Sequence, residues 1–562
     1  MIDTLRHLFA SAPELALFLA LALGHALGRV KLGRFSLGGV AASLLVALVI
    51  GQSGVVLPDA LKAVCFGLFI YAVGFKSGPE FFGGLNRSSL KLVLAAVIHC
   101  VVALVTIVVL ARLFDLGKGF AAGVGAGALT QTAMLGTAGD ALRRMGFSAE
   151  EVGRFSSEMA VGFAITYVFG TVGVILFLRS VVPRLLGIDV RKAARELEAQ
   201  LAEGGAVARP GLIAAFAPIT ARAFEVEAGR AAGKTLGVVL HGIERAAVER
   251  VVRGDQALGP DPGLVLEAGD LVGVAGRLAS VLDAGGRLGP EVESREALSF
   301  PMKAMTIVIT DRRVCGRTLG EIRDYLGREG VAGVYVSNCK RQGFELPLFL
   351  HNEVRRGDVF ELIGRPDQVE KVTSLIGHAE ADTDRSDLVY HTLGIAAGTL
   401  LGLIVVPVAG IPVTLGVGGG VLLSGLVFGW WHVRRPAAGA MPGATQWFLS
   451  EFGLSAFAAA TGLSAGPAAI AAIQTHGLTL LFVGFAVTLV PIIAAYLVGH
   501  YVFRLHPAIL LGALAGGQTV AAGLNAATDE AESVTPVLGF TVTYAISNVL
   551  LAVWGPLIVA LT

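Results

Sequence analysis

Charged residues are scarce in this chain: Asp, Glu, Lys and Arg make up 15% of its 562 residues, against about 25% in a typical soluble domain. The formal net charge is +1, so no excess of one sign indicates nucleic-acid binding. The four cysteines show neither metal-ligand spacing nor a secreted disulfide pattern. No Gly-x-x-x-x-Gly-Lys-Ser/Thr motif is present, which disfavours ATP-driven transport. We expect neither an enzyme nor a bound cofactor or metal.

Apolar sequence is abundant instead. Hydrophobic residues form 54% of the chain, and much of its glycine lies inside apolar runs, where small residues let helices approach closely. A helical membrane span needs about 20 apolar residues. The apolar segments lie at 13–29, 36–52, 60–83, 89–113, 119–138 and 157–182, and again at 390–408, 413–431, 446–473, 477–503, 507–526 and 536–561. We expect the first segment to be retained as a span rather than cleaved as a signal peptide.

Three short motifs occur once in each half of the chain, in the same order. They are Phe75-Lys76-Ser77-Gly78-Pro79 with Leu463-Ser464-Ala465-Gly466-Pro467, Ala128-Leu129-Thr130-Gln131-Thr132 with Ala515-Gly516-Gly517-Gln518-Thr519, and Leu37 to Gly51 with Leu415 to Gly429. These echoes predict a duplicated membrane unit interrupted by an insert. Paired, interrupted apolar segments are the best sequence indication of a transporter's binding site.

The segments 119–138 and 507–526 are rich in Gly and carry Gln and Thr at their centres. Lipid tolerates irregular backbone only where it is buried in protein or lines a cavity, so we expect both to be re-entrant or broken. Lys and Arg near the span ends favour five remaining spans per half with a cytoplasmic insert. Against this topology, it places five basic residues outside: Arg112, Lys118, Arg143, Arg144 and Arg154. An odd span number inverts the second half, places both termini outside, and lets the Gln-Thr segments meet near the midplane.

The predicted fold is a polytopic α-helical membrane protein with two inverted repeats of five spans plus one re-entrant or broken segment each. Two small cytoplasmic α+β domains are inserted between the repeats. The predicted parts are a first repeat at 1–185, a charged connector helix at 186–204, modules at 205–285 and 297–377, and a second repeat at 386–562. The modules echo each other in sequence, and their Gly269-Asp270 and Gly357-Asp358 pairs are typical of turns before strands.

The whole chain resembles the aspartate:alanine exchanger family of bacterial antiporters, on the strength of the Ser-Gly-Pro and Gln-Thr echoes in two halves around tandem modules. The modules resemble RCK C-terminal (TrkA-C-like) domains, which implies ligand sensing and dimerisation. The resemblance implies exchange of small amino acids or dicarboxylates such as aspartate, alanine, glutamate or succinate in the bacterial inner membrane. It also implies kinship with antiporter folds that have crossed, broken helices, a homodimer, and a regulatory small ligand at the modules.

The candidate substrate-binding residues begin with the Gln-Thr segments. They are Thr130, Gln131, Thr132, Gln518 and Thr519. Their amides and hydroxyls suit a carboxylate or an ammonium group, and half-helix N-termini favour anions. Alternatively, such polar residues only bridge helices, which contributes about 0.6 kcal/mol each in membrane proteins.

The Gly-Pro pairs supply a second set of candidates: Ser77, Gly78, Pro79, Ser464, Gly466 and Pro467. Proline removes a helical hydrogen bond and glycine permits irregular backbone, so we expect a helix end or break here, at the midplane or in a surface turn. Lys76 either attracts an anionic substrate or anchors its helix end at the interface. Asp140 and Asn525, just past the Gln-Thr segments, are further candidates, Asp140 for a substrate amine or for helix capping.

The sequence therefore predicts a secondary antiporter for small carboxylates that works by alternating access, with a sliding or rocking bundle. The alternative is a potassium or proton-coupled cation transporter gated by its RCK-like modules. That alternative needs a carbonyl filter of the Thr-Val-Gly-Tyr-Gly type or paired midplane carboxylates. Neither is evident in the sequence, although Asp140 and Glu158 leave a little room for it.

Overall fold

The computed structural model describes residues 8–9, 11–32, 35–36, 38–55, 57–83, 89–187, 189–202, 219–241, 246–341, 343–379, 385–408, 411–414, 416–435 and 438–562. The chain divides into two compact units. The first joins Met1–Ala194, Asp382–Ala531 and Thr535–Thr562, and the second joins Arg195–Ala381 with Glu532–Val534. The start of the first predicted module, 205–218, and the echo ends Leu37 and Leu415 lie outside the described residues.

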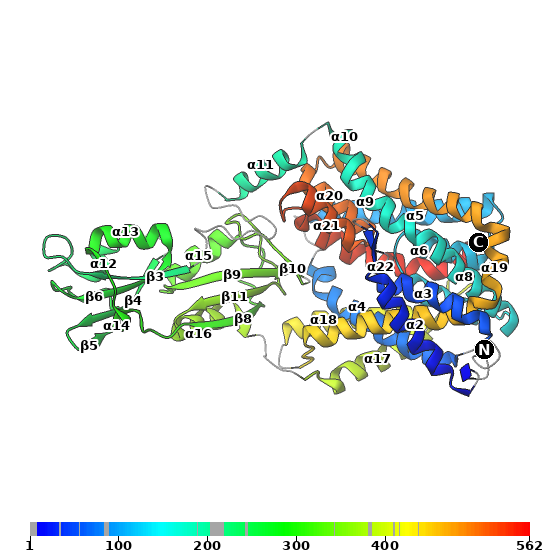
Figure 1. The fold of residues 1–562 in the computed structure, drawn as a ribbon, viewed down its shortest axis with the longest axis horizontal. Coiled ribbons are helices and arrows are strands. Elements are labelled where there is room, and N and C mark those ends of the chain that lie inside the picture. The colour runs from blue at the N-terminus through cyan, green and yellow to red at the C-terminus, as the bar shows by residue number, and fades with distance from the viewer. Residues whose placement is uncertain are drawn as a thin grey trace. The chain divides into compact units, whose positions relative to one another are not determined.

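The first unit is mainly helical (Figure 1). Before the insert it contains α2 (Pro13–Gly28), the hairpin β1 (Lys31–Leu32) and β2 (Phe35–Ser36), α3 (Gly39–Ile50) with η1 (Gly51–Ser53), α4 (Asp59–Gly83), α5 (Leu90–Leu113), α6 (Lys118–Ala128), α7 (Ala133–Arg144), and α8 (Ala149–Val168), which continues through η2 (Phe169–Gly173), α9 (Val174–Leu176), η3 (Phe177–Val181) and α10 (Val182–Leu186). The connector helix is α11 (Val190–Ala202).

After the insert the elements follow the same order. They are α17 (Leu388–Leu403), the hairpin β13 (Val405–Val408) and β14 (Ile411–Thr414), α18 (Gly416–Arg434), α19 (Gly443–Leu497) with η4 (Val498–Val502), α20 (Pro507–Gly517), α21 (Ala521–Ala531) and α22 (Val537–Leu561). Among the described residues, six helices are long and apolar enough to cross a membrane. They are Asp59–Gly83, Leu90–Leu113, Ala149–Leu185, Gly416–Arg434, Ala469–Val502 and Val537–Leu561. The chain is thus a multi-pass membrane protein.

Helix α19 differs from the sequence prediction. The predicted segments 446–473 and 477–503 are one continuous helix, so the expected boundary between them is wrong. The reason is composition: four of the five residues in 468–472 are alanine, the strongest helix former. The two parts of α19 pack against different helices. In the first part Gly462 faces Leu44 of α3, and in the second part the ring of Phe482 lies with its centroid 5.6 Å from that of Phe114, which follows α5.

The Gly-Pro pairs do not break their helices, contrary to the prediction. Pro79 lies inside α4 and Pro467 inside α19. Each proline deprives the carbonyl four residues earlier of its helical partner, and these carbonyls belong to Phe75 and Leu463.

Each of these two carbonyls faces a glycine in the opposite half of the chain. The Phe75 oxygen occupies the space that a Cβ on Gly429 of α18 would need, and the Leu463 oxygen does the same at Gly51, after α3. Such close approach permits weak Cα–H···O contacts. Gly51 and Gly429 are the last residues of the third echo. Each contact therefore joins a Gly-Pro echo in one half of the chain to the third echo in the other half.

The second unit contains two antiparallel sheets of identical topology. The first module has β3 (Ile219–Glu225), α12 (Leu236–Val239), β4 (Ala246–Arg253), β5 (Gln256–Leu258), β6 (Leu271–Arg277), α13 (Leu278–Leu288), β7 (Glu291–Val292) and α14 (Arg295–Leu298). The second has β8 (Lys303–Ile309), α15 (Leu319–Arg328), β9 (Val334–Arg341), β10 (Phe344–Glu345), β11 (Val359–Gly364), α16 (Pro366–Ile376) and β12 (Gly377–Ala379). The strand orders are β5-β4-β6-β3-β7 and β10-β9-β11-β8-β12.

The two Gly-Asp turns each hold a buried aspartate that is paired with an arginine. Gly269 and Gly357 have positive φ, as tight turns require. Asp270 accepts two hydrogen bonds from Arg253, both 2.8 Å, and Asp358 accepts two from Arg341, both 2.7 Å. Burial alone would raise the pKa of Asp270, but hydrogen bonds from Arg253 and from a backbone N–H hold that pKa below its usual range.

Removing the second of these pairs should cost more stability than removing the first. Asp358→Ala should destabilise its module by about 3–5 kcal/mol, because the Arg341 guanidinium, only 4% exposed, loses its counterion while buried. Asp270→Ala should cost less, since Arg253 is 32% exposed and can be hydrated. Hydrogen exchange of the β6 and β11 amides in the full-length protein measures both changes. Equal losses in the two modules would contradict the explanation from burial.

Candidate functional site

Two short interruptions separate α6 from α7 and α20 from α21. At their centres Thr130 and Thr519 have φ of 52° and 56°, in the left-handed region that β-branched residues avoid. In each interruption two backbone N–H groups bond back to the preceding half-helix, as at Thr130 to Gly127 and Thr519 to Gly516, the pattern of a Schellman cap. Glycine normally occupies this position. A threonine held in this conformation therefore has a strained backbone, and such strain is concentrated at functional sites.

The structural equivalence of the interruptions differs from the sequence echo by two residues. The echo aligns Gln131 with Gln518, whereas the backbone pairs Thr130 with Thr519, because these two residues share the same conformation and cap hydrogen bonds. Gln518 therefore precedes its turn and Gln131 follows its own. The repeated Gln-Thr dipeptide therefore locates both interruptions, but it aligns their residues two positions away from the structural alignment.

The interruptions contact each other directly. The Thr130 hydroxyl donates to the Gln518 carbonyl at 3.2 Å, and the Thr519 hydroxyl donates to the Leu129 carbonyl at 3.0 Å. The two hydroxyl oxygens are 3.5 Å apart. Each strained threonine thus supplies a donor to a last-turn carbonyl of the other half-helix. We call this contact, made by Leu129, Thr130, Gln518 and Thr519, the crossing.

Buried polar side chains surround the crossing. Gln518 donates from Nε2 to the carbonyls of Ala128 (3.4 Å) and Thr488 (3.2 Å), while Gln131 donates to Oδ1 of Asn548 at 3.1 Å. Thr132 is buried as well. His99 of α5 is fully buried beside Gly517. Its two ring nitrogens and the Gln518 Oε1 make no hydrogen bond of normal geometry within the described part of the chain.

A cavity of about 780 Å³ lies farther along α7. Gly136, Gly139, Asp140 and Arg143 line it from one face of this helix, since residues three and four apart share a helical face. Most of the remaining wall comes from both halves of the chain: the N-terminal parts of α4, α8 and α18, and residues of α19 including Thr461 and Ser464.

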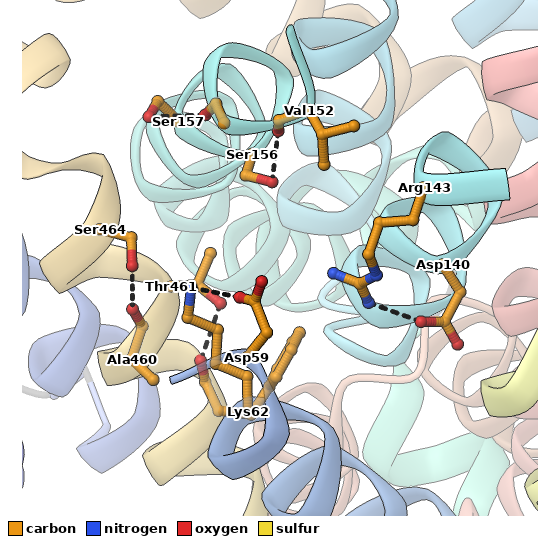
Figure 2. A network of polar contacts seen from close by, with 12 residues as sticks. Asp59, Lys62, Asp140, Arg143, Val152, Ser156, Ser157, Ala460, Thr461 and Ser464 are labelled. Atoms are coloured by element: carbon orange, nitrogen blue, oxygen red, sulfur yellow. Dashed lines mark hydrogen bonds and ion pairs between the residues drawn. The ribbon is translucent and has the colours of Figure 1, made fainter. Parts of the chain in front are cut away.

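Figure 2 shows several of the polar groups that border this cavity, among them Asp59, Lys62, Asp140 and Arg143. Lys62 pairs with Asp59 at 3.1 Å and Arg143 with Asp140 at 2.6 Å. The other Asp140 oxygen accepts the backbone N–H of Gly418 at 3.0 Å, so a residue of α7 caps the first turn of α18, as the helix dipole favours. The cavity therefore combines anionic and cationic groups with small hydroxyl side chains.

The sequence-predicted residues fall into three groups. Thr130, Gln131, Thr132, Gln518 and Thr519 come together at or around the crossing, whereas Asp140 and Ser464 line the cavity. Ser77 is buried, Gly78 packs against Leu426 of α18, and Gly466 packs against Gly51. Lys76 is exposed on α4 and Asn525 on α21.

Sequence reasoning missed several groups at this site. No motif in the sequence includes Lys62, Asp59 or Thr461. The charge of Arg143 enters the sequence analysis only as evidence on membrane topology. The spacing of Asp140 and Arg143, three residues apart in a Gly-rich helix, was the available signal. Among the described residues, no group of three or more His, Cys, Asp or Glu side chains could hold a metal ion.

Comparison with known proteins is consistent with this architecture. The family described as "Predicted Permease Membrane Region" (Asp-Al_Ex) matches residues 16–183 and 390–560. An uncharacterized transporter of Bradyrhizobium diazoefficiens is 40% identical over 100% of this chain and 99% of its own length. One of Zymomonas mobilis is 38% identical over the same shares. No solved structure matches. The chain belongs to the aspartate:alanine exchanger family of membrane transporters.

Proposed function

We propose that the protein is a secondary antiporter that exchanges small amino acids or dicarboxylates, such as aspartate, alanine, glutamate or succinate, by alternating access. The observation that carries this proposal is the crossing, where a strained threonine from each half of the chain bonds to the half-helix of the other. A helix interrupted in both halves at the same place suits a substrate site shared by the halves.

The cavity supplies chemistry for such a substrate. Lys62 and Arg143 can exchange their intramolecular carboxylate partners for those of a dicarboxylate, and Asp59 or Asp140 can receive an α-ammonium group. Charge-assisted hydrogen bonds of this kind are roughly twice as strong as neutral ones. Each of these four charged groups has a counter-ion within the protein, so a substrate would exchange one ion pair for another.

Alternating access in this proposal rests on two halves of opposite orientation, with both termini outside. Ser464 lines the cavity, and its counterpart in the Gly-Pro echo is Lys76. When the site opens to the other side, Lys76 should therefore line the equivalent cavity. A bundle containing the broken helices would slide or rock against the helices joined by the Gly-Pro contacts.

The second unit is proposed to be cytoplasmic and to regulate or dimerise the transporter. The shared strand order of its two sheets supports tandem modules related to RCK C-terminal domains, each built around one five-stranded sheet. A small ligand would bind to these modules, and the active protein would be a homodimer in the bacterial inner membrane.

Counterflow in proteoliposomes tests the exchange. Purified protein should accumulate labelled aspartate, alanine, glutamate or succinate only when unlabelled substrate is trapped inside. Arg143→Gln should raise KM about tenfold, in line with the loss of one charge-assisted hydrogen bond, whereas Arg184→Gln, at an exposed arginine that does not line the cavity, should leave it unchanged. Uptake of rubidium without exchange of any carboxylate would overturn the proposal in favour of a cation transporter.

A further inference from the structure

The two soluble modules carry a β-bulge at the same place, but with different residues. In the first module the register between β4 and β6 skips Glu249, and in the second the register between β9 and β11 skips Ser337. A bulge redirects the side chain of its extra residue. Ser337 is exposed and donates to the Glu361 carbonyl at 3.1 Å. Glu249 is directed instead toward the second module.

Glu249 lies buried in the contact between the two modules. It is 5% exposed, and a Cβ on Gly333, in the turn before β9, would lie 2.7 Å from its Oε1. Nearby, the Tyr335 hydroxyl donates to the Ala275 carbonyl of the first module at 2.8 Å. Within the described residues, neither carboxyl oxygen of Glu249 has a hydrogen-bond partner.

The charged and titratable groups that face this carboxyl, among the described residues, are Arg365, Asp367 and Tyr335. Arg365 is already engaged with Asp367 through hydrogen bonds of 3.1 and 2.7 Å, so its charge is largely compensated. Desolvation dominates and raises the pKa of Glu249 to about 7, with Arg365 opposing and Asp367 reinforcing the shift. A buried carboxylate without donors is costly, whereas the neutral acid is tolerated.

We propose that Glu249 makes the docking of the two modules depend on pH, so that a rise in cytoplasmic pH loosens their contact. The docked state holds the neutral carboxyl, and the ionised carboxylate is stable only after the modules separate and water reaches it. Both modules have the bulge, but its extra residue is the titratable Glu249 in the first module and Ser337 in the second.

The direction follows from linkage. The pKa of Glu249 in the docked state lies above the ordinary value of about 4.3 that it regains on exposure, so the docked state binds more protons. The equilibrium constant for docking should therefore fall about tenfold for each pH unit between about 4.5 and 7, and level off above pH 7. Docking is strongest in acid and weakest at neutral and alkaline pH.

Hydrogen exchange on the full-length protein between pH 5 and 8 tests this inference. After correction for intrinsic rates, protection of residues 333–335 and of β4 should fall up to about a hundredfold from pH 5 to 7 in the wild type. It should stay high and constant in Glu249→Gln, which keeps the side chain's shape and cannot ionise. Glu345→Gln, at an exposed glutamate of β10, removes one carboxyl elsewhere and should behave like the wild type.

Two results would overturn the proposal: pH-independent protection in the wild type, or an unchanged pH dependence in Glu249→Gln. Should that variant fail to fold, as judged by exchange at β11, Arg365→Gln provides a second measurement. Loss of the Arg365 charge should move the levelling-off to higher pH, and an unmoved curve would also contradict the proposal.

Discussion

Replacing Thr130 and Thr519 together by glycine is expected to lower exchange about 10- to 100-fold while leaving the folded protein nearly as stable. Glycine relieves left-handed strain of about 1–2 kcal/mol at each position, which offsets the loss of a hydrogen bond of about 1 kcal/mol. The hydroxyl donors that tie each interruption to the opposite half disappear. Counterflow rate and melting temperature of the double variant, measured on one preparation, separate the two effects.

The serine double variant is the matched control for this experiment. Thr130→Ser with Thr519→Ser keeps both hydroxyls and removes only the methyl groups, so exchange should remain close to wild type. Wild-type exchange by the glycine variant would mean that the threonine hydroxyls have no part in transport. A large loss of stability with glycine would mean that the positive φ values store little strain.

Alanine at Gly429 is expected to disrupt the membrane unit. Its Cβ would occupy the position of the Phe75 carbonyl oxygen, which belongs to backbone and cannot rotate away. Overpacking against side chains costs about 1–3 kcal/mol, so displacement of a whole helix should cost at least 3 kcal/mol. Gly51→Ala should act alike through the Leu463 carbonyl. Yield from membranes and melting temperature in detergent give the measurement.

The chain offers a control on one of the same helices. Gly67 lies inside α4, and a Cβ there meets nothing within 4 Å, so Gly67→Ala should be neutral or slightly stabilising. Pro79→Ala should also be tolerated, because it restores an N–H to the Phe75 carbonyl. If Gly429→Ala melted at the wild-type temperature, the tight contact between α4 and α18 would be refuted.

Family membership and the helical, multi-pass character followed from the echoes and the low charge. Repeated motifs and composition can be read from the sequence without knowing any tertiary contact. The two Gln-Thr segments were correctly expected to be interrupted, since they combine several glycines with central Gln and Thr, and lipid tolerates irregular backbone only where protein or a cavity surrounds it. Thr130 and Thr519 were among the candidates, and they carry the contact between the interruptions.

Other features depended on tertiary contacts that the sequence does not record. Pro79 was expected to break its helix, because nothing in the local sequence reveals that Gly429, 350 residues away, accommodates the freed carbonyl. The shifted equivalence of Gln131 and Gln518 required backbone dihedral angles. The pairing of Arg253 with Asp270 could have been found, since Arg341 and Asp358 repeat both positions at the same offset.

The orientation of the two halves is tested most directly by labelling single cysteines from one side of the membrane. In a background without the native cysteines, the labelling positions are Met145→Cys after α7 and Asp529→Cys near the end of α21, both exposed. Each lies near the C-terminal end of the second half-helix of its interruption. An impermeant maleimide added to intact cells should label the first and spare the second, and inside-out vesicles should reverse the pattern. Labelling of both residues from the same side would show that the halves run in parallel, and exchange through a site made by oppositely oriented halves would be ruled out.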